Sequence, residues 1–408
     1  MKIDPDHVAI ADSIIRFIDR DVVSLEEKHH ALLRDDRSMF DSDGRYVPEI
    51  LSLRRQVRMR SAELGFYTLF GSEKLGGSEM GACAYAHIQE VLYRKYGPNR
   101  TLIQHVVIPS PFTNGLSPVL CQLAPEVFEQ YREGVSSGDK TLCFALSEPD
   151  AGSDVMAMKT RAVRDGDGWI INGTKQWITN SPYADYAMVF AVTDPEKVAQ
   201  RRGGITGFFV DTRADGFSVP GITRVMGHLG GETGIVVLDN VRVRDDHRLG
   251  PVDRGLAVAI SGVSAGRLGL SALCLGLARW ALDMATEYSR IRKTFGVPIS
   301  EHQAIQFMLA DSLMDIYAAK SMLHDCAASI DAGDNAVAKT SMVKAFCTEM
   351  VGRVIDKSIQ IHGGMGLTNE LRLEEGYRLA RQVRIPDGTG EIQRRTIARQ
   401  LLSDQVIL

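Results

Sequence analysis

The chain opens with apolar residues at the spacing of one helix face. Between residues 8 and 18, aliphatic side chains recur three or four positions apart, and such a stripe buries one side of a helix. Two further helices are expected over residues 47–64 and 80–96. The prolines at positions 109 and 111 are expected to end or kink the next helix. The pattern predicts a helical N-terminal domain over residues 1–137.

The pattern changes near residue 141 to short runs rich in β-branched and aromatic residues. These runs predict strands over residues 141–146, 169–171, 175–179, 186–192, 207–211 and 234–238. Asn172-Gly173 lies between two of these runs and is typical of a two-residue hairpin turn. Because no helix separates the strands, we expect a middle domain over residues 138–250, built as an antiparallel sheet or small barrel.

Helical periodicity returns after residue 250. Long apolar-periodic runs cover residues 255–295, 301–330 and 336–360, with breaks at Pro298, at residues 331–334 and at residues 363–366. Three long helices and one or two shorter ones are enough for a four-helix-type bundle over residues 251–408. The sequence thus predicts a multidomain α+β protein, with an all-β domain between two all-α domains.

Composition narrows the class of protein. The 408 residues are 44% apolar and 24% charged, with a net charge of −4, so neither nucleic acid nor an anionic membrane is expected as a partner. The acidic N-terminus has no apolar signal core, and we expect no membrane span. The six scattered cysteines lack Cys-x-x-Cys spacing. They are expected to be reduced residues of a cytoplasmic protein without a metal site.

A turn near the C-terminus carries a candidate general base. Asp387 stands between Pro386, which stops the preceding helix, and Gly388, which permits close approach of the backbone. A carboxylate held on a stiff turn in an apolar region can accept a proton. The alternative is an ordinary helix start, with Asp387 or Thr389 as its N-cap.

Two segments of the middle region can approach a planar cofactor. Residues 145–154 place small side chains, hydroxyls and acids in a glycine-containing loop. Trp177 and Thr179 alternate with Ile178, so the first two share one face of a strand and could stack on and hydrogen-bond a flat ring. The alternatives are a solvated acidic turn and an ordinary sheet face.

Two C-terminal segments could contact phosphates. An arginine beside a phenylalanine in residues 292–296 could hold a pyrophosphate and cover a ring, or Arg292 and Lys293 could merely complement a helix dipole. The glycines of residues 363–366 follow a helix instead of a strand, so they form no dinucleotide fingerprint. Their exposed backbone would suit a polyphosphate or a neighbouring subunit.

Taken together, these segments resemble the acyl-CoA dehydrogenase family over nearly the whole chain. The motifs that carry the resemblance are residues 145–157, 172–180, 292–296, 301–303 and 360–366, with the spacing to Asp387-Gly388-Thr389. The resemblance implies one FAD per subunit and an acyl-CoA substrate. It also implies an electron-transfer flavoprotein as acceptor and a homotetramer built as a dimer of dimers.

The resemblance also implies roles for individual residues. Asp387 would be the catalytic base, and the substrate would contact Ser153, Arg267 and Gly388. In the same subunit, FAD would contact Phe144, Leu146, Ser147, Ser153, Trp177, Ile178, Thr179, Thr389 and Glu391. The FAD of a neighbouring subunit would be reached from the segments that hold Arg292, Thr294, Phe295, His302, Gln303, Gln360, Gly363 and Gly364.

The implied reaction is α,β-dehydrogenation, in which the base takes the α-proton while a β-hydride passes to flavin N5. Burial under an acyl chain is expected to raise the pKa of the base. The usual family base is glutamate, and aspartate is shorter by one C–C bond, roughly 1.5 Å. Some branches place the base where Gly266 stands here.

Aspartate at the base position also resembles nitroalkane oxidases and some cyclic acyl-CoA dehydrogenases. The alternatives are therefore a flavin oxidase of nitroalkane-oxidase type or an enoyl-CoA reductase on the same scaffold. A third alternative is a non-catalytic scaffold that has lost FAD.

Overall fold

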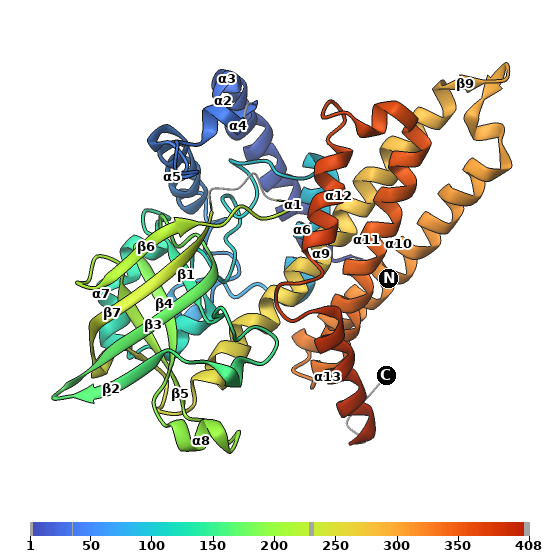
Figure 1. The fold of residues 1–408 in the computed structure, drawn as a ribbon. Coiled ribbons are helices and arrows are strands. Elements are labelled where there is room, and N and C mark those ends of the chain that lie inside the picture. Colours follow the sequence, from blue (N-terminus) through green and yellow to red (C-terminus); the bar gives the residue numbers. More distant parts are fainter. Residues whose placement is uncertain (1–2, 35, 228–231, 404–408) are drawn as a thin grey trace.

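The computed structural model describes residues 3–34, 36–227 and 232–403. Its elements follow the order helices, sheet, helices, which confirms the predicted fold class (Figure 1). The described N-terminal helices are α1 (Pro5–Phe17), α2 (Val23–Lys28), α3 (His30–Arg34), α4 (Asp36–Met39), α5 (Pro48–Glu63), α6 (Ala82–Tyr96) and α7 (Pro125–Ser136). A π-helical turn, Ile18–Val22, joins α1 to α2.

The N-terminal helices begin where local chemistry favours them. Asp4 caps α1 by accepting a hydrogen bond from the backbone N–H of Asp6, and Pro5 occupies the first turn. The expected helices over 47–64 and 80–96 are α5 and α6. The helix expected before Pro109 is wrong, because residues 97–117 form turns and no continuous helix. Isolated hydrogen bonds such as that from Val107 to Ile103 hold these turns, which bury Leu102 and Val106.

The middle sheet comprises β1 (Leu142–Ala145), β2 (Arg161–Asp165), β3 (Gly168–Thr179), β4 (Tyr186–Val192), β5 (Ile205–Asp211), β6 (Phe217–Ile222), β7 (Thr233–Arg244) and β8 (Arg248–Leu249), with the short helix α8 (Pro195–Ala199) after β4. The strand order is β6-β7-β3-β2-β4-β5-β8, and β1 pairs with β4. Most pairs are antiparallel, as expected, but β1 and β2 both run parallel to β4. The sheet is therefore mixed.

The hairpin predicted at Asn172-Gly173 is wrong, because β3 continues through both residues. They form a bulge against β7, where the backbone N–H of Asn240 donates to Oδ1 of Asn172 at 2.8 Å. A β-carbon on Gly173 would lie 2.3 Å from Oγ1 of Thr160, so the glycine allows close strand contact. The turn between β2 and β3 is formed at residues 166–167 instead.

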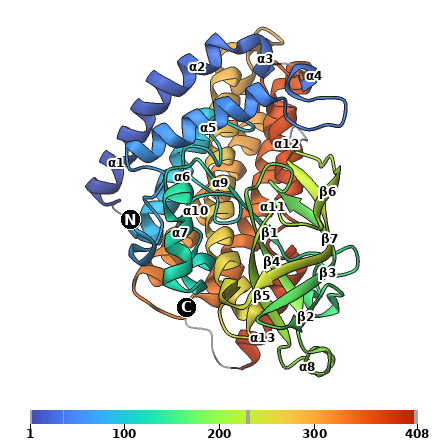
Figure 2. The same cartoon turned by 90° about the vertical axis from the view of Figure 1, so that its left-hand side faces the viewer.

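The C-terminal helices are α9 (Gly255–Ile291), α10 (Gln303–Asp331), α11 (Val337–His362), α12 (Leu373–Gln382) and α13 (Gly390–Leu402). Between α9 and α10, a small hairpin is made of β9 (Lys293–Thr294) and β10 (Val297–Pro298). Helix α9 runs from the sheet to the far end of the bundle and packs on α6 and α11 (Figures 1 and 2). Helix α9 thus connects the sheet to the bundle core.

Among the described residues, α9 alone is long and apolar enough, by length and composition, to cross a membrane. Half of its most apolar window is buried in the structure. Glycine and serine interrupt its aliphatic residues, so the sequence shows no unbroken apolar run there. The predicted domain boundaries after residues 137 and 250 lie between α7 and β1 and between β8 and α9. These two domain boundaries stay predictions.

Candidate active site

The loop between α12 and α13 holds Asp387 through its main chain. Nε of Arg267 on α9 donates to the carbonyl oxygen of Asp387 at 2.9 Å. Nε2 of Gln393 on α13 donates to the same oxygen at 3.0 Å and to that of Gly388 at 2.9 Å. Asp387 itself has φ +58°, a conformation that non-glycine residues adopt at some cost. Side chains from two helices therefore fix an otherwise unfavourable loop.

The Asp387 carboxyl lies in a notch on α9. A β-carbon on Gly266 would stand 2.9 Å from Oδ2 of Asp387 and 2.3 Å from Cε2 of Phe112. The Phe112 ring packs in turn on Phe144, with ring centroids 5.2 Å apart. The absence of a side chain at residue 266 thus lets the carboxyl and an aromatic ring meet beside α9.

Burial raises the pKa of Asp387 to about 6, against the attraction of the positive charges on Lys344 and Arg267. A carboxyl of this pKa is ionised at neutral pH and is a stronger base than a solvated aspartate. The direction agrees with the expected effect of burial. Chemically, the arrangement can accept and return a proton.

Helix α13 does not use Asp387 as its cap. The hydroxyl of Thr389 accepts a hydrogen bond from the backbone N–H of Ile392 at 3.4 Å and is the N-cap. Of the two possible caps, Thr389 therefore serves the helix, and the Asp387 side chain points to the notch at Gly266. Glu391 lies exposed in the first turn of α13.

A buried ion pair holds the loop that follows β1. Nζ of Lys175, on β3, lies 2.8 Å from Oε1 of Glu148, and both side chains are almost fully buried. Glu148 also accepts the backbone N–H groups of Lys159 and Thr160, and Lys175 donates to the carbonyl oxygen of Leu146. Ser147 is fixed by its carbonyl oxygen, which accepts the N–H of Gln176. The pair thus joins both ends of residues 146–160 to β3.

The end of β3 presents an aromatic side chain outward. Trp177 is 52% exposed and has φ +65°, and Thr179 is exposed on the same side. Ile178 is buried in the sheet core, so its side chain faces away from them. Ser153 is exposed in the preceding loop, and a β-carbon on Gly152 would meet nothing within 4 Å. An open loop and an exposed tryptophan leave room for a flat ligand.

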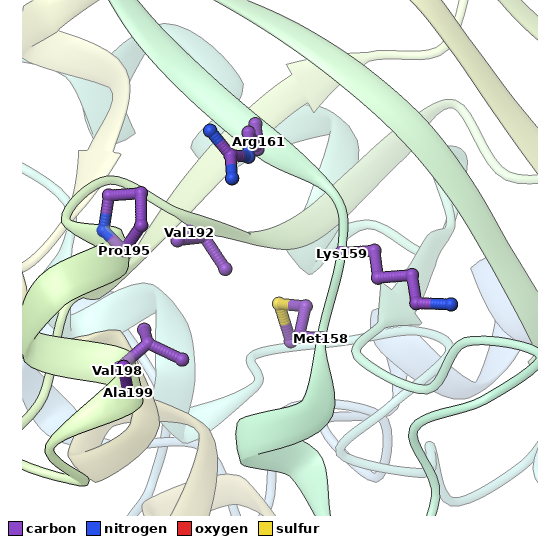
Figure 3. Close-up of a pocket in the computed structure, with 7 residues that line it drawn as sticks. All are labelled: Met158, Lys159, Arg161, Val192, Pro195, Val198 and Ala199. Atoms are coloured by element: carbon purple, nitrogen blue, oxygen red, sulfur yellow. The ribbon is translucent and has the colours of Figure 1, made fainter.

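A surface groove of about 440 Å³ joins that loop to α13. It is lined by Ser153, Asp154, Arg201, Ile392, Arg395 and Arg399. The structure thus brings Ser153 near the helix that begins after Thr389. A second pocket, of about 270 Å³, lies on the middle domain and is lined by Met158, Lys159, Arg161, Val192, Pro195, Val198 and Ala199 (Figure 3).

The remaining predicted residues lie at the other end of α9. The hydroxyl of Thr294 and Nε2 of His302 are 2.9 Å apart, and Phe295 is 97% exposed at the tip of the β9–β10 hairpin. Arg292 follows the last residue of α9, and Gln303 begins α10. Gln360 lies in the last turn of α11, and Gly363 and Gly364 follow that helix. The helical rise of 1.5 Å per residue places Arg292 roughly 40 Å along α9 from Gly266. Within one subunit, these residues therefore lie far from Asp387 and Trp177.

Two family models match this chain. Residues 143–241 match the acyl-CoA dehydrogenase middle domain, and residues 253–402 match the acyl-CoA dehydrogenase C-terminal domain. The chain belongs to the acyl-CoA dehydrogenase family.

Individual members show how far the similarity reaches. The 3-(aryl)acrylate reductase of Clostridium sporogenes is 36% identical over 85% of this chain and 90% of its own length. The caffeyl-CoA reductase–Etf complex subunit CarC of Acetobacterium woodii is 34% identical over 89% and 92%. The structure of butyryl-CoA dehydrogenase from Megasphaera elsdenii superposes with a TM-score of 0.83, at 26% identity over 98% of this chain and 99% of that one.

This acyl-CoA dehydrogenase family member is an oxidoreductase that acts on acyl-CoA, and its cofactor is FAD. The residues present fit that cofactor. The exposed Trp177 and Thr179 offer one face to a ring, and the groove at Ser153 carries arginines that suit phosphates. Among the residues that the structure describes, no group of three or more His, Cys, Asp or Glu side chains could hold a metal ion.

Several residues that shape the site could not be predicted from the sequence. Phe112 comes from the turns after α6, Lys344 from α11 and Gln393 from α13. Each reads as an ordinary core or helix residue in the sequence, and only the fold brings it to Asp387. The basic run at Arg394-Arg395 offered a signal for the groove, since arginine beside an expected cofactor segment is typical of anion binding.

Proposed function

We propose that this protein catalyses α,β-dehydrogenation of an acyl-CoA thioester, with Asp387 removing the α-proton. The observation that supports the proposal is the Asp387 carboxyl itself. It is ionised at neutral pH with its pKa raised to about 6, and a loop fixed by Arg267 and Gln393 holds it beside Gly266.

The chemistry needs a base at this place. The α-proton of a thioester is a very weak acid, and loss of a β-hydride alone would leave a cation. Bound FAD supplies the acceptor for the hydride. Asp387 takes the proton at a carboxylate oxygen, and the fixed loop holds that oxygen in one direction, which lowers the entropic part of the barrier.

The notch on α9 supports a shorter acid. Aspartate reaches roughly 1.5 Å less far than glutamate, and here the carboxyl packs directly against the backbone of Gly266. Phe112 fills the other side of the same notch. We infer that the substrate approaches α9 at this point, so that the α-carbon comes to the shorter base.

The same site can work in the opposite direction. Two similar proteins are named as reductases, one for 3-(aryl)acrylates and one for caffeyl-CoA in a complex with Etf. Reduction of an enoyl-CoA would use the protonated Asp387 to deliver the α-proton, because the forward and reverse reactions share one transition state. We therefore retain enoyl-CoA reduction as the second candidate and an electron-transfer flavoprotein as the redox partner.

We further propose that the active form is a homotetramer. The residues expected to contact FAD fall into two sets at opposite ends of α9, so a second chain has to supply one set. The exposed face of α10 is apolar, and it includes Phe307, Leu313, Met314 and Tyr317. Large exposed apolar residues on one helix are typical of a surface that a partner covers.

Anaerobic mixing of the FAD-loaded protein with a panel of acyl-CoAs tests the function. Straight, branched, cyclic and aryl-propionyl thioesters should be compared, and the flavin absorbance followed. Dehydrogenation predicts bleaching with at least one thioester. For the reverse reaction, the chemically reduced protein should be reoxidised by the matching enoyl-CoA. Peroxide production with nitroethane, and no change with any thioester in either direction, would instead indicate an oxidase.

A further inference from the structure

Lys344 on α11 is a fully buried lysine with an unusual set of partners. Its Nζ donates to the carbonyl oxygen of Gly388 at 2.8 Å and to that of Arg384 at 3.2 Å. Both carbonyls belong to the loop that carries Asp387, one on each side of it. Lys175, which is also fully buried, pairs with a carboxylate instead. Burial of an ammonium is costly without compensation, so this placement calls for a reason.

We propose that Lys344 is a positioning residue for the base, because its ammonium clamps the loop on both sides of Asp387 and its charge keeps the neighbouring carboxylate ionised. The proposal rests on the proposed function only in taking Asp387 as the base. Lys344 contacts main-chain oxygens of the loop, so it acts through Asp387 and not on the substrate.

The charges around Asp387 single out Lys344. Two cations face the carboxyl, Lys344 from α11 and Arg267 from α9. Burial raises the pKa of Asp387, and both cations lower it, Lys344 more than Arg267. From α6, Tyr85 is a neutral neighbour, since burial raises its pKa to about 12. Glu391 of α13 and Cys274 of α9 face Lys344. Of these groups, only Lys344 and Arg267 favour the ionised base.

The influence is mutual. Burial lowers the pKa of Lys344 to about 8, and the charge of Asp387 opposes that fall. With Asp387 at about 6, both groups are charged between these two values. Each therefore stabilises the charged form of the other in the same pH range, in which the base has to be free of its proton.

The clamp and the charge can be separated by mutation. Arg267 and Gln393 also hold the carbonyl of Asp387, so the loop keeps two anchors when Lys344 is replaced. Lys344→Met removes the charge and the donors at similar volume. Lys344→Gln keeps a donor without a charge, and Lys344→Arg keeps the charge.

The pH dependence of flavin reduction in the FAD-loaded protein tests the charge. The acid limb of the profile is the fall of the rate at low pH. In Lys344→Met and Lys344→Gln we expect this limb to move to higher pH by about one unit or more. That shift is a tenfold loss of rate at a fixed pH below the limb, with recovery towards the wild-type rate above it. The Arg variant should keep the wild-type limb. An unmoved limb in the Met and Gln variants overturns the electrostatic role.

The matched control is Lys357→Met on the same helix. Lys357 lies 3.5 Å from Asp311 and away from the loop, so its replacement should not move the limb. If the Met variant of Lys344 does not load FAD, the Gln and Arg variants decide, because they differ from each other in charge and both can donate.

Hydrogen exchange of the amides of residues 384–389 tests the clamp without any turnover. Lys344→Met should speed exchange in this loop, and Lys357→Met should not. Unchanged exchange overturns the clamp. Because this readout does not depend on Asp387 being the base, a failure of the proposed function and a failure of this inference give different results: full turnover in Asp387→Asn for the first, and an unchanged loop in Lys344→Met for the second.

Discussion

A β-carbon on Gly266 would stand 2.9 Å from the Oδ2 atom of Asp387. The two residues are far apart in sequence, one in the first half of α9 and the other in the loop before α13. Glycine within a helix costs about 1 kcal/mol relative to alanine. Here it gives the carboxyl and the Phe112 ring the space that any side chain would take.

Gly266→Ala should therefore damage both packing and reactivity. The added methyl would meet the ring of Phe112 at 2.3 Å and the base at 2.9 Å. We expect a destabilisation of about 1–3 kcal/mol and a fall in the rate of flavin reduction, measured by thermal unfolding and by anaerobic stopped flow.

Gly352→Ala on α11 is the control, since nothing lies within 4 Å of its β-carbon position. It should be neutral or stabilising by up to about 1 kcal/mol. If Gly266→Ala and Gly352→Ala had equal stability and equal rates of flavin reduction, residue 266 would not need to be glycine.

The fall of activity at low pH, the acid limb of the pH profile, should show the pKa of the base. The Asp387 carboxylate has to be unprotonated to accept the α-proton, so the rate falls as pH drops through its pKa. With that pKa raised to about 6 by burial, kcat/KM should fall tenfold per unit below about pH 6 and level off above it. A limb at pH 4 in the wild-type protein would mean that the carboxyl is solvated and that its burial has no role.

The buried Lys175–Glu148 pair should matter for FAD retention as well as for stability. Lys175→Met leaves Glu148 buried without its partner, which costs about 3–5 kcal/mol. It also removes two of the contacts between residues 146–160 and β3 and leaves the hydrogen bond from Gln176 to Ser147. The loop is then held less firmly, so bound FAD should be lost more readily on dilution. Denaturation at fixed FAD concentration and the flavin content after gel filtration measure the two effects.

The exposed pair Lys159–Asp150 provides the control for that experiment. Both side chains lie largely in solvent, so Lys159→Met should change stability by less than about 1 kcal/mol and leave FAD bound. If Lys175→Met kept its flavin as well as Lys159→Met does, the ion pair would not be needed for residues 146–160 to retain FAD.

The layered order of the fold could be predicted because hydrophobic periodicity is local. Helical spacing gave α5, α6 and the three long C-terminal helices, and β-rich runs gave β4 and β5. The hairpin predicted at Asn172-Gly173 was wrong because this dipeptide suits a β-bulge as well as a turn. Pairing with β7 produces the bulge, and that pairing cannot be seen in the local sequence. Strand β2 was missed since three of its five residues are charged, which hides the β-rich pattern.

The base could also be predicted, but its surroundings could not. Asp387 stands out in the sequence by its flanking proline and glycine. Phe112, Lys344 and Gln393 carry no local signal, because their roles arise from contacts across distant parts of the chain. The expectation that Arg292 and Gly363 act away from Asp387 came from family resemblance. The lengths of α9 and α11 explain that separation physically.

The rate of flavin reduction in Asp387→Asn, compared with Asp387→Glu and the wild-type protein, tests the central claim most directly. Asparagine keeps the shape of the side chain and cannot take the α-proton. We predict that the Asn variant binds FAD and acyl-CoA normally and reduces flavin slower by a factor on the order of 10³ or more, whereas the Glu variant keeps measurable activity. Wild-type flavin reduction by the FAD-loaded Asn variant would contradict the assignment of Asp387 as the base.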